Sequence, residues 1–91
     1  MKYTDYLKAV EVDVDLCLTI AMEECSELIQ AISKAKRGKL NLINLVEEVA
    51  DVIICLGWLE RLYFEDTELL STWIDYKTNR IVERLNKGEF K

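Results

Sequence analysis

The absence of proline is the feature of this 91-residue sequence that most constrains its fold. Proline interrupts helices because it lacks a backbone donor and clashes with the preceding turn. Only Gly38, Gly57 and Gly88 offer the other common break. Apolar residues recur at helical spacing along most of the chain. The sequence therefore predicts an all-α protein, and its length predicts a single domain over residues 1–91.

Capping residues and terminal charges predict the first two helices. We expect a short helix near Tyr3–Val10 and a long one over about Val14–Lys36. Asp13 or Asp15 can cap the long helix, because an aspartate side chain accepts from free backbone N–H groups. Gly38 can supply the left-handed residue that ends it.

The second half of the chain predicts two further helices. After a loop over Gly38–Leu42, Asn44 and Glu47 have the spacing of a capping box for a third helix that runs to about Tyr63. Asp66 or Thr67 is expected to cap a fourth helix, which ends near residue 88. Together these elements predict an antiparallel helical bundle.

Apolar residues make up 51% of the sequence, which is a large share for a small chain. Domains of this length bury only a modest fraction of their surface. We therefore expect the bundle to be completed by homo-oligomerisation, as a dimer or tetramer. A tightly packed monomer is the alternative.

Composition excludes several classes of function and site. A net charge of −5 disfavours non-specific binding to nucleic acid. The chain has no histidine, which excludes Ser-His-Asp catalysis and histidine-containing zinc sites. Cys17, Cys25 and Cys55 lie in apolar runs without C-x-x-C spacing, so we expect buried thiols.

No apolar run is long enough to span a bilayer, and Met1–Tyr6 does not resemble a signal peptide. We therefore expect a cytoplasmic protein with no membrane partner.

Carboxylates occur inside the two most apolar helices. Glu24 and Glu27 are three residues apart, as are Glu48 and Asp51, so each pair shares a helix face. Buried carboxylates must be paired, protonated or bound to metal. If the two helices pack antiparallel, the four side chains can meet around Mg²⁺ or Mn²⁺, which prefer oxygen ligands. The alternative is a solvated polar stripe on amphipathic helices.

Two motifs carry a family resemblance. The stretch Glu23–Glu27 (EECSE), followed by Glu48–Asp51 (EVAD), resembles the E-E-x-x-E and E-x-x-D motifs of the all-α NTP pyrophosphatase superfamily. That superfamily includes MazG proteins, dimeric dUTPases, dCTP pyrophosphatases and phosphoribosyl-ATP pyrophosphatases. The similarity runs from Leu16 to Gly88, and Ala31–Gly38 with Tyr76–Arg84 is most similar to the short MazG-like proteins of phages and bacteria.

The resemblance implies a Mg²⁺-dependent enzyme that cleaves nucleoside triphosphates between the α and β phosphates, giving a monophosphate and pyrophosphate. It also implies that neighbouring subunits complete each pocket. A spare carboxylate would take a proton from the attacking water. Glu23 can alternatively be a solvated rim residue, and Glu47 a capping residue. The implied metal ligands are Glu24, Glu27, Glu48 and Asp51, and the implied catalytic residues are Glu23 and Glu47.

Lys77, Arg80 and Arg84 form one stripe on the fourth helix and are candidates for binding the substrate phosphates. The alternative is a solvated basic face. Lys34 and Arg37 are weaker candidates, because cations at a helix C-terminus are already favourable there.

Trp58 and Trp73 can stack on a base, but core or interface packing is the commoner role of tryptophan.

Two other functions remain open: a non-catalytic helical module that dimerises, and a phosphoribosyl-ATP pyrophosphatase. The second is disfavoured, because that group carries a histidine pattern after E-x-x-D and none follows Asp51 here. Dimeric dUTPases are usually much longer chains.

Overall fold

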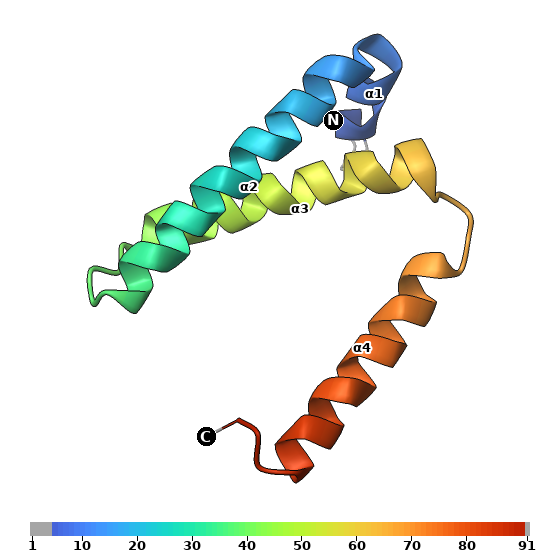
Figure 1. The fold of residues 1–91 in the computed structure, drawn as a ribbon. Coiled ribbons are helices and arrows are strands. Elements are labelled where there is room, and N and C mark those ends of the chain that lie inside the picture. The colour runs from blue at the N-terminus through green and yellow to red at the C-terminus, as the bar shows by residue number, and fades with distance from the viewer. Residues whose placement is uncertain (1–4, 91) are drawn as a thin grey trace.

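The computed structural model describes residues 5–90, which are helical except for short connections and contain no β-strand. The prediction of an all-α chain is therefore confirmed for this part of the sequence. A 3₁₀ turn and a one-turn helix precede three long helices (Figure 1). The elements are η1 (Asp5–Lys8), α1 (Ala9–Val12), α2 (Val14–Lys36), α3 (Leu42–Tyr63) and α4 (Leu69–Asn86).

The N-terminus of α2 forms as the sequence predicts. The Asp13 side chain accepts a hydrogen bond from the backbone N–H of Leu16 at 3.0 Å. Asp13 also has extended backbone angles, which separate α2 from α1. Within the predicted first helix, residues 3 and 4 lie outside the described part of the chain. The remainder consists of η1 and α1, which ends two residues later than predicted, at Val12.

The predicted capping box of α3 is wrong. Asn41 is the N-cap, and its side chain accepts from the backbone N–H of Asn44 at 3.0 Å. Asn44 lies within the first turn, where its amide donates instead to Glu48 Oε1 at 3.4 Å. Both asparagines are compatible with a cap, and the earlier one begins the helix. Glu47 therefore has no capping role.

The start of α4 also differs from the prediction. The N-cap position is Glu68, which makes no side-chain capping bond. Thr67 nevertheless bonds to the first turn, because its hydroxyl accepts from the Leu69 N–H at 3.4 Å while donating to the Phe64 carbonyl at 2.6 Å. Asp66 has a left-handed φ of 61° and belongs to the connection rather than to the cap.

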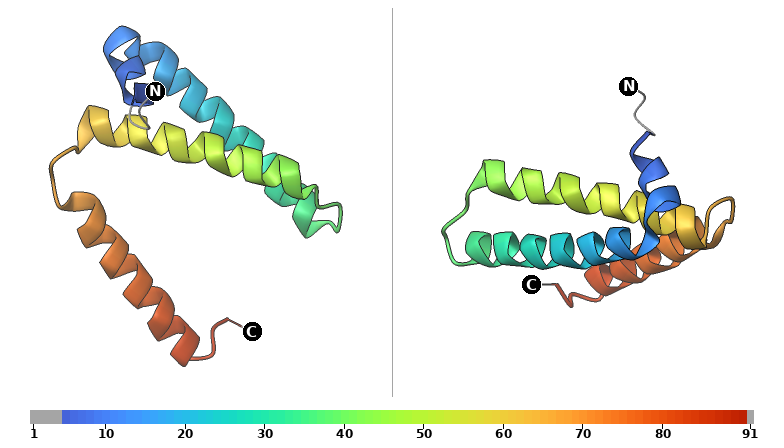
Figure 2. Two further views of the ribbon diagram at one scale, coloured as in Figure 1. Left: turned by 180° about the vertical axis from the view of Figure 1, so that it is seen from behind. Right: turned by 90° about the horizontal axis from the view of Figure 1, so that it is seen from above.

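Helices α2 and α3 pack side by side and antiparallel, with η1 and α1 across one end of the pair (Figures 1 and 2). The buried apolar residues are small, so the two backbones approach closely. None of them within residues 5–90 is larger than valine. They are Val10, Cys17, Ala21, Ala31 and Cys55.

Helix α4 turns away after α3 and packs against no other helix of the described chain (Figure 2). None of its residues is buried. Its apolar side chains, including Leu70, Trp73 and Ile74, are exposed. None of the described helices combines the length and apolarity that crossing a bilayer requires.

A close contact fixes η1 on α3. Trp58 Nε1 donates to the Tyr6 carbonyl at 2.8 Å, and the Tyr6 ring lies over Gly57. A Cβ on Gly57 would overlap the Tyr6 hydroxyl and would lie 3.0 and 3.1 Å from two ring carbons. Glycine inside this helix therefore permits the approach of the N-terminal segment.

A double-mutant cycle tests this contact. Gly57→Ala should gain about 1 kcal/mol of helix propensity, but only where the ring is absent. We expect that stabilisation in a Tyr6→Ala background and its loss or reversal in the wild-type background, measured by urea unfolding. Equal gains in both backgrounds would contradict the contact.

Candidate metal centre

Three carboxylates meet at the contact between α2 and α3. One oxygen each of Glu24, Glu27 and Glu48 lies within 4.8 Å of the other two. Glu24 and Glu27 reach the seam together because they are three residues apart on α2. Glu48 is 9% exposed and is the one buried charged residue among residues 5–90.

The acidic residues form two cross-helix pairs. Glu24 lies within hydrogen-bonding reach of Asp51, and Glu27 lies within reach of Glu48. From the first pair to the second, the chain advances three residues on α2, from Glu24 to Glu27, and goes back three residues on α3, from Asp51 to Glu48. Antiparallel packing requires this register. Two carboxyl groups can share a hydrogen bond only if one of them carries a proton. The arrangement therefore needs either bound protons or a cation.

Burial raises the pKa of two of these groups. The pKa of Glu24 rises from 4.5 to about 7, chiefly because the group is desolvated, then because of its hydrogen bond to Asp51 and the nearby negative charges. Desolvation and the adjacent Glu27 also raise the pKa of Glu48. Both shifts favour the protonated form when no cation is bound.

Two buried oxygens have no hydrogen-bond partner within the described chain: Glu24 Oε2 and Glu48 Oε2. Such atoms are costly to bury, and a cation between them would satisfy both. The donors are all carboxylate oxygens, which suit Mg²⁺ or Mn²⁺. The residues present therefore fit a hard divalent ion.

The other acidic candidates surround this cluster. Asp51 is half-buried and reaches the cluster through Glu24. Glu23 and Glu47 are exposed. The charge of Glu47 contributes to the raised pKa of Glu48, so Glu47 is near enough to act electrostatically.

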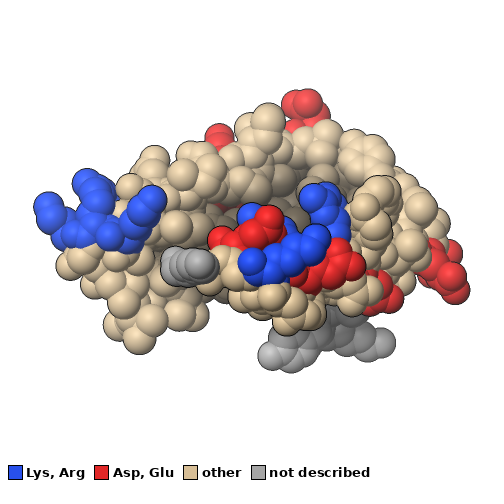
Figure 3. Space-filling view, turned by 60° about the horizontal axis from the view of Figure 1, so that its bottom comes forward, with Lys and Arg blue, Asp and Glu red and all other residues tan. Residues whose placement is uncertain are grey.

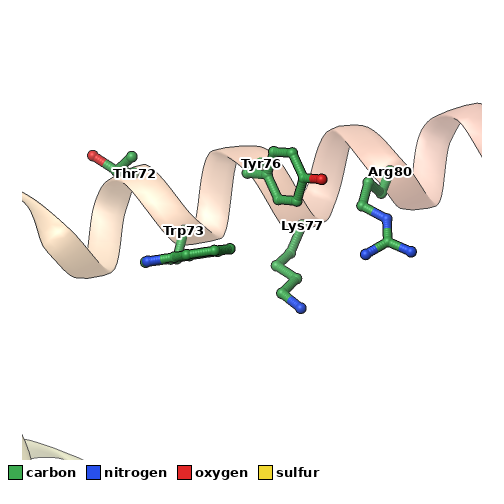
Figure 4. Close-up of a pocket in the computed structure, with 5 residues that line it drawn as sticks. All are labelled: Thr72, Trp73, Tyr76, Lys77 and Arg80. Carbon is green, nitrogen blue, oxygen red and sulfur yellow. The ribbon is translucent and has the colours of Figure 1, made fainter.

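The basic stripe of α4 is not brought to the cluster, since α4 packs against neither α2 nor α3. Trp73, Lys77 and Arg80 project to the same side of α4 (Figure 4). The Lys77 ammonium lies 5.8 Å from the centre of the Trp73 ring. Arg84 instead faces the chain end, with its guanidinium 3.3 Å from Glu89 and 4.7 Å from the centre of the Phe90 ring.

Lys34 and Arg37 lie at the turn that joins α2 to α3, where basic side chains gather on the surface (Figure 3). Lys34 is seven residues beyond Glu27, which corresponds to about 10 Å along the helix. Arg37 Nε donates to the Ser33 carbonyl at 3.3 Å. These two residues stabilise the end of α2, and the structure does not place them beside the cluster.

The sequence predicts other roles for two residues next to the carboxylates, Asn44 and Cys55, and does not predict their place beside the cluster. Asn44 donates to Glu48, and burial, followed by the nearby charges of Glu24 and Asp51, raises the pKa of Cys55. The spacing of four residues between Asn44 and Glu48 could have indicated the first contact. Asp51 is likewise four residues before Cys55 on α3, whereas Glu24 lies on α2 and gives no local signal.

The prediction that all three cysteines are buried is wrong for one of them. Cys17 and Cys55 are buried, whereas Cys25 is exposed. Residues of an apolar run on a helix lie on more than one face, and α3 covers only one side of α2, so Cys25 stays exposed.

Of the two tryptophans, Trp58 is half-buried against η1, and Trp73 is 56% exposed on α4.

Comparison of the chain with protein-family models, with curated proteins and with solved structures gives no match, so the site is interpreted from its own geometry.

The pKa of Glu24 predicts how stability depends on pH. The folded chain keeps this proton up to pH about 7, whereas the unfolded chain releases it near 4.5. The folded state therefore binds more protons in this window, and the stability of the metal-free protein should fall as pH rises through it. Mg²⁺ requires the ionised carboxylates, so its stabilising effect should grow over the same window.

Thermal unfolding near pH 5 and near pH 8, with and without Mg²⁺, measures both effects. Glu24→Gln should flatten the pH dependence and weaken the response to Mg²⁺. A metal-free protein that becomes more stable between these pH values, or a variant that behaves like wild type, would contradict the assignment.

Proposed function

We propose that this chain is a Mg²⁺-dependent nucleoside triphosphate pyrophosphohydrolase of the MazG-like type, which converts NTPs or dNTPs to the monophosphate and pyrophosphate. The observation that supports it is the cluster of Glu24, Glu27 and Glu48 between two packed helices, with two buried oxygens that lack a partner. A chain without histidine that buries carboxylates in this way is suited to hard-metal chemistry on phosphates.

In this proposal Glu24, Glu27, Glu48 and Asp51 hold the metal. A bound Mg²⁺ neutralises phosphate charge and lowers the pKa of bound water. The second oxygens of Glu24 and Glu48 are already desolvated, so they need little reorganisation to bind a cation. Asn44 orients Glu48 by donating to its other oxygen.

Glu23 and Glu47 are the proposed proton acceptors for the attacking water. Both are next to residues of the cluster and are exposed to solvent. A carboxylate in that position can accept the proton of the attacking water and pass it to solvent. General-base assistance of this kind typically contributes about 10²–10⁴-fold.

Lys77, Arg80 and Arg84 are proposed to bind the substrate phosphates, which an arginine fork can contact in a bidentate manner. They must then approach the cluster, either through movement of α4 about residues 64–68 or from α4 of a neighbouring chain in a homo-oligomer. Lys34 and Arg37 remain weaker candidates for the same role. Cytoplasmic location, and the absence of a nucleic-acid partner, are further parts of this proposal.

The second candidate function is a non-catalytic helical module that dimerises. The large exposed apolar surface favours it, since such surfaces mark association sites. Under this alternative the carboxylates are protonated groups in a packed seam and bind no metal.

A panel of the common NTPs and dNTPs tests the proposal. With Mg²⁺ we expect the monophosphate and pyrophosphate as products, and Glu48→Gln should lower kcat by at least about 100-fold because a buried ligand is lost. Release of orthophosphate would contradict cleavage between the α and β phosphates.

Glu60→Gln is the matched control, since it makes the same substitution at an exposed position of α3 away from the cluster. It should retain wild-type activity. Both variants should remain helical by circular dichroism. Equal activity in Glu48→Gln and wild type would exclude the carboxylate cluster as the active site.

A further inference from the structure

Among residues 5–90, the Asn44 side chain alone donates an N–H group to a carboxylate of the cluster. Its Nδ2 donates to Glu48 Oε1 at 3.4 Å. The remaining hydrogen bonds from side-chain N–H groups to carboxylates in this part of the chain join arginines to glutamates outside the cluster. Asn44 is therefore the side chain through which the rest of the protein can control how a metal ligand is presented.

The N-cap of α3 leaves the Asn44 side chain available for this contact. Asn41 accepts from the Asn44 backbone N–H at 3.0 Å, so the first turn of the helix is already capped. Asn44 is half-buried and lies four residues before Glu48, a spacing at which side chains meet on one face of a helix. The amide of Asn44 can therefore serve the cluster and not the helix end.

The two carboxylate oxygens of Glu48 differ in their surroundings. Oε1 accepts from Asn44, whereas Oε2 is buried and has no hydrogen-bond partner within the described chain. Glu48 as a whole is only 9% exposed, so solvent is largely excluded from it. A buried oxygen without a partner is costly, and a cation would satisfy it. Glu48 thus has one oxygen held by the protein and one left for a ligand.

Asn44 satisfies one oxygen of Glu48 and leaves the negative charge of the cluster in place. A lysine or arginine at this position would neutralise the carboxylate and compete with a metal ion. The ion pairs within residues 5–90 all lie outside the cluster. An amide is a neutral donor, so it can hold the carboxylate without removing the charge that a divalent cation needs.

Mg²⁺ and Ca²⁺ use carboxylates differently. Mg²⁺ requires nearly octahedral coordination at about 2.0–2.1 Å, whereas Ca²⁺ takes about six to eight oxygens at about 2.3–2.6 Å and can bind both oxygens of one carboxylate. A carboxylate with one oxygen already held by the protein therefore suits Mg²⁺ better than Ca²⁺.

We propose that Asn44 is a positioning residue that shifts the selectivity of the metal centre towards Mg²⁺ and away from Ca²⁺. It does so by holding Glu48 Oε1, which leaves Oε2 as the one oxygen that Glu48 offers. The inference rests on the metal centre of the proposed function and concerns its selectivity. Asn44 itself need not touch the ion, the substrate or the reacting water.

Asn44→Leu removes the amide donor and keeps a side chain of similar shape. It should raise the Kd of Mg²⁺ by about tenfold or more, as loss of the partner of a metal ligand typically does. The Kd of Ca²⁺ should change less, because Ca²⁺ can use the released oxygen. We therefore expect the ratio of the Kd of Ca²⁺ to the Kd of Mg²⁺ to fall by at least about fivefold. Isothermal titration calorimetry of the metal-free protein with each ion at pH 8 measures both constants.

Asn41→Leu is the matched control, since it makes the same substitution three residues earlier on the same helix. It removes the cap of α3 and should lower the melting temperature. The Asn41 side chain bonds to the helix backbone and not to Glu48, so the ratio of the two Kd values should remain that of wild type. Asn44→Ala removes the same donor without adding apolar surface and should lower the ratio as Asn44→Leu does. Circular dichroism checks that each variant is helical.

A wild-type ratio in Asn44→Leu and Asn44→Ala, or an equal fall of the ratio in Asn41→Leu, would overturn the selectivity role of Asn44. The titrations separate this failure from failure of the proposed function. If wild type binds Mg²⁺ and loss of the amide leaves the ratio unchanged, only the role of Asn44 is excluded. If wild type binds neither ion, the metal centre is excluded together with this inference. No nucleotide is used, so the absence of hydrolysis would not affect the result.

Discussion

The burial of acidic side chains between α2 and α3 is the constraint on which the rest of the structure depends. The fully buried apolar residues of the two helices are alanine and cysteine, which lets the helices approach closely, and the same contact contains Glu24 and Glu48. Desolvation and like charge oppose ionisation there, which is why the pKa of Glu24 rises to about 7. The helix pair therefore favours protonated carboxylates up to near neutral pH, where the cation of the proposed function would compete with these protons.

The composition of the seam also limits what one chain can achieve alone. Small buried residues supply little apolar area, so the α2–α3 pair gains less from burial than a core of leucine and isoleucine would give. Many of the larger apolar side chains of α2 and α3, and all of those on α4, are exposed. The small residues that let the two carboxylate-bearing helices approach therefore also leave larger apolar side chains on the surface.

Much of the helical architecture was predictable because it depends on local chemistry. The cap at Asp13 and the end of α2 near Gly38 follow from side-chain bonds and backbone preferences within a few residues. Where two residues were equally suited, local reasoning chose wrongly. The sequence predicts Asn44 as the cap of α3, but Asn41 caps the helix by accepting from the Asn44 N–H, and the Asn44 side chain donates to Glu48 instead.

The sequence by itself determined that this chain is helical and that acidic pairs share helix faces, because helical periodicity places residues three apart side by side. Only the tertiary structure decided which oxygens meet. It pairs Glu24 with Asp51 and Glu27 with Glu48, and it leaves Cys25 exposed while Cys55 is buried. It also decided that α4 stands apart from the acidic cluster. The physical reason is that the register between helices and the direction of a connection depend on contacts between residues distant in sequence, which no local pattern encodes.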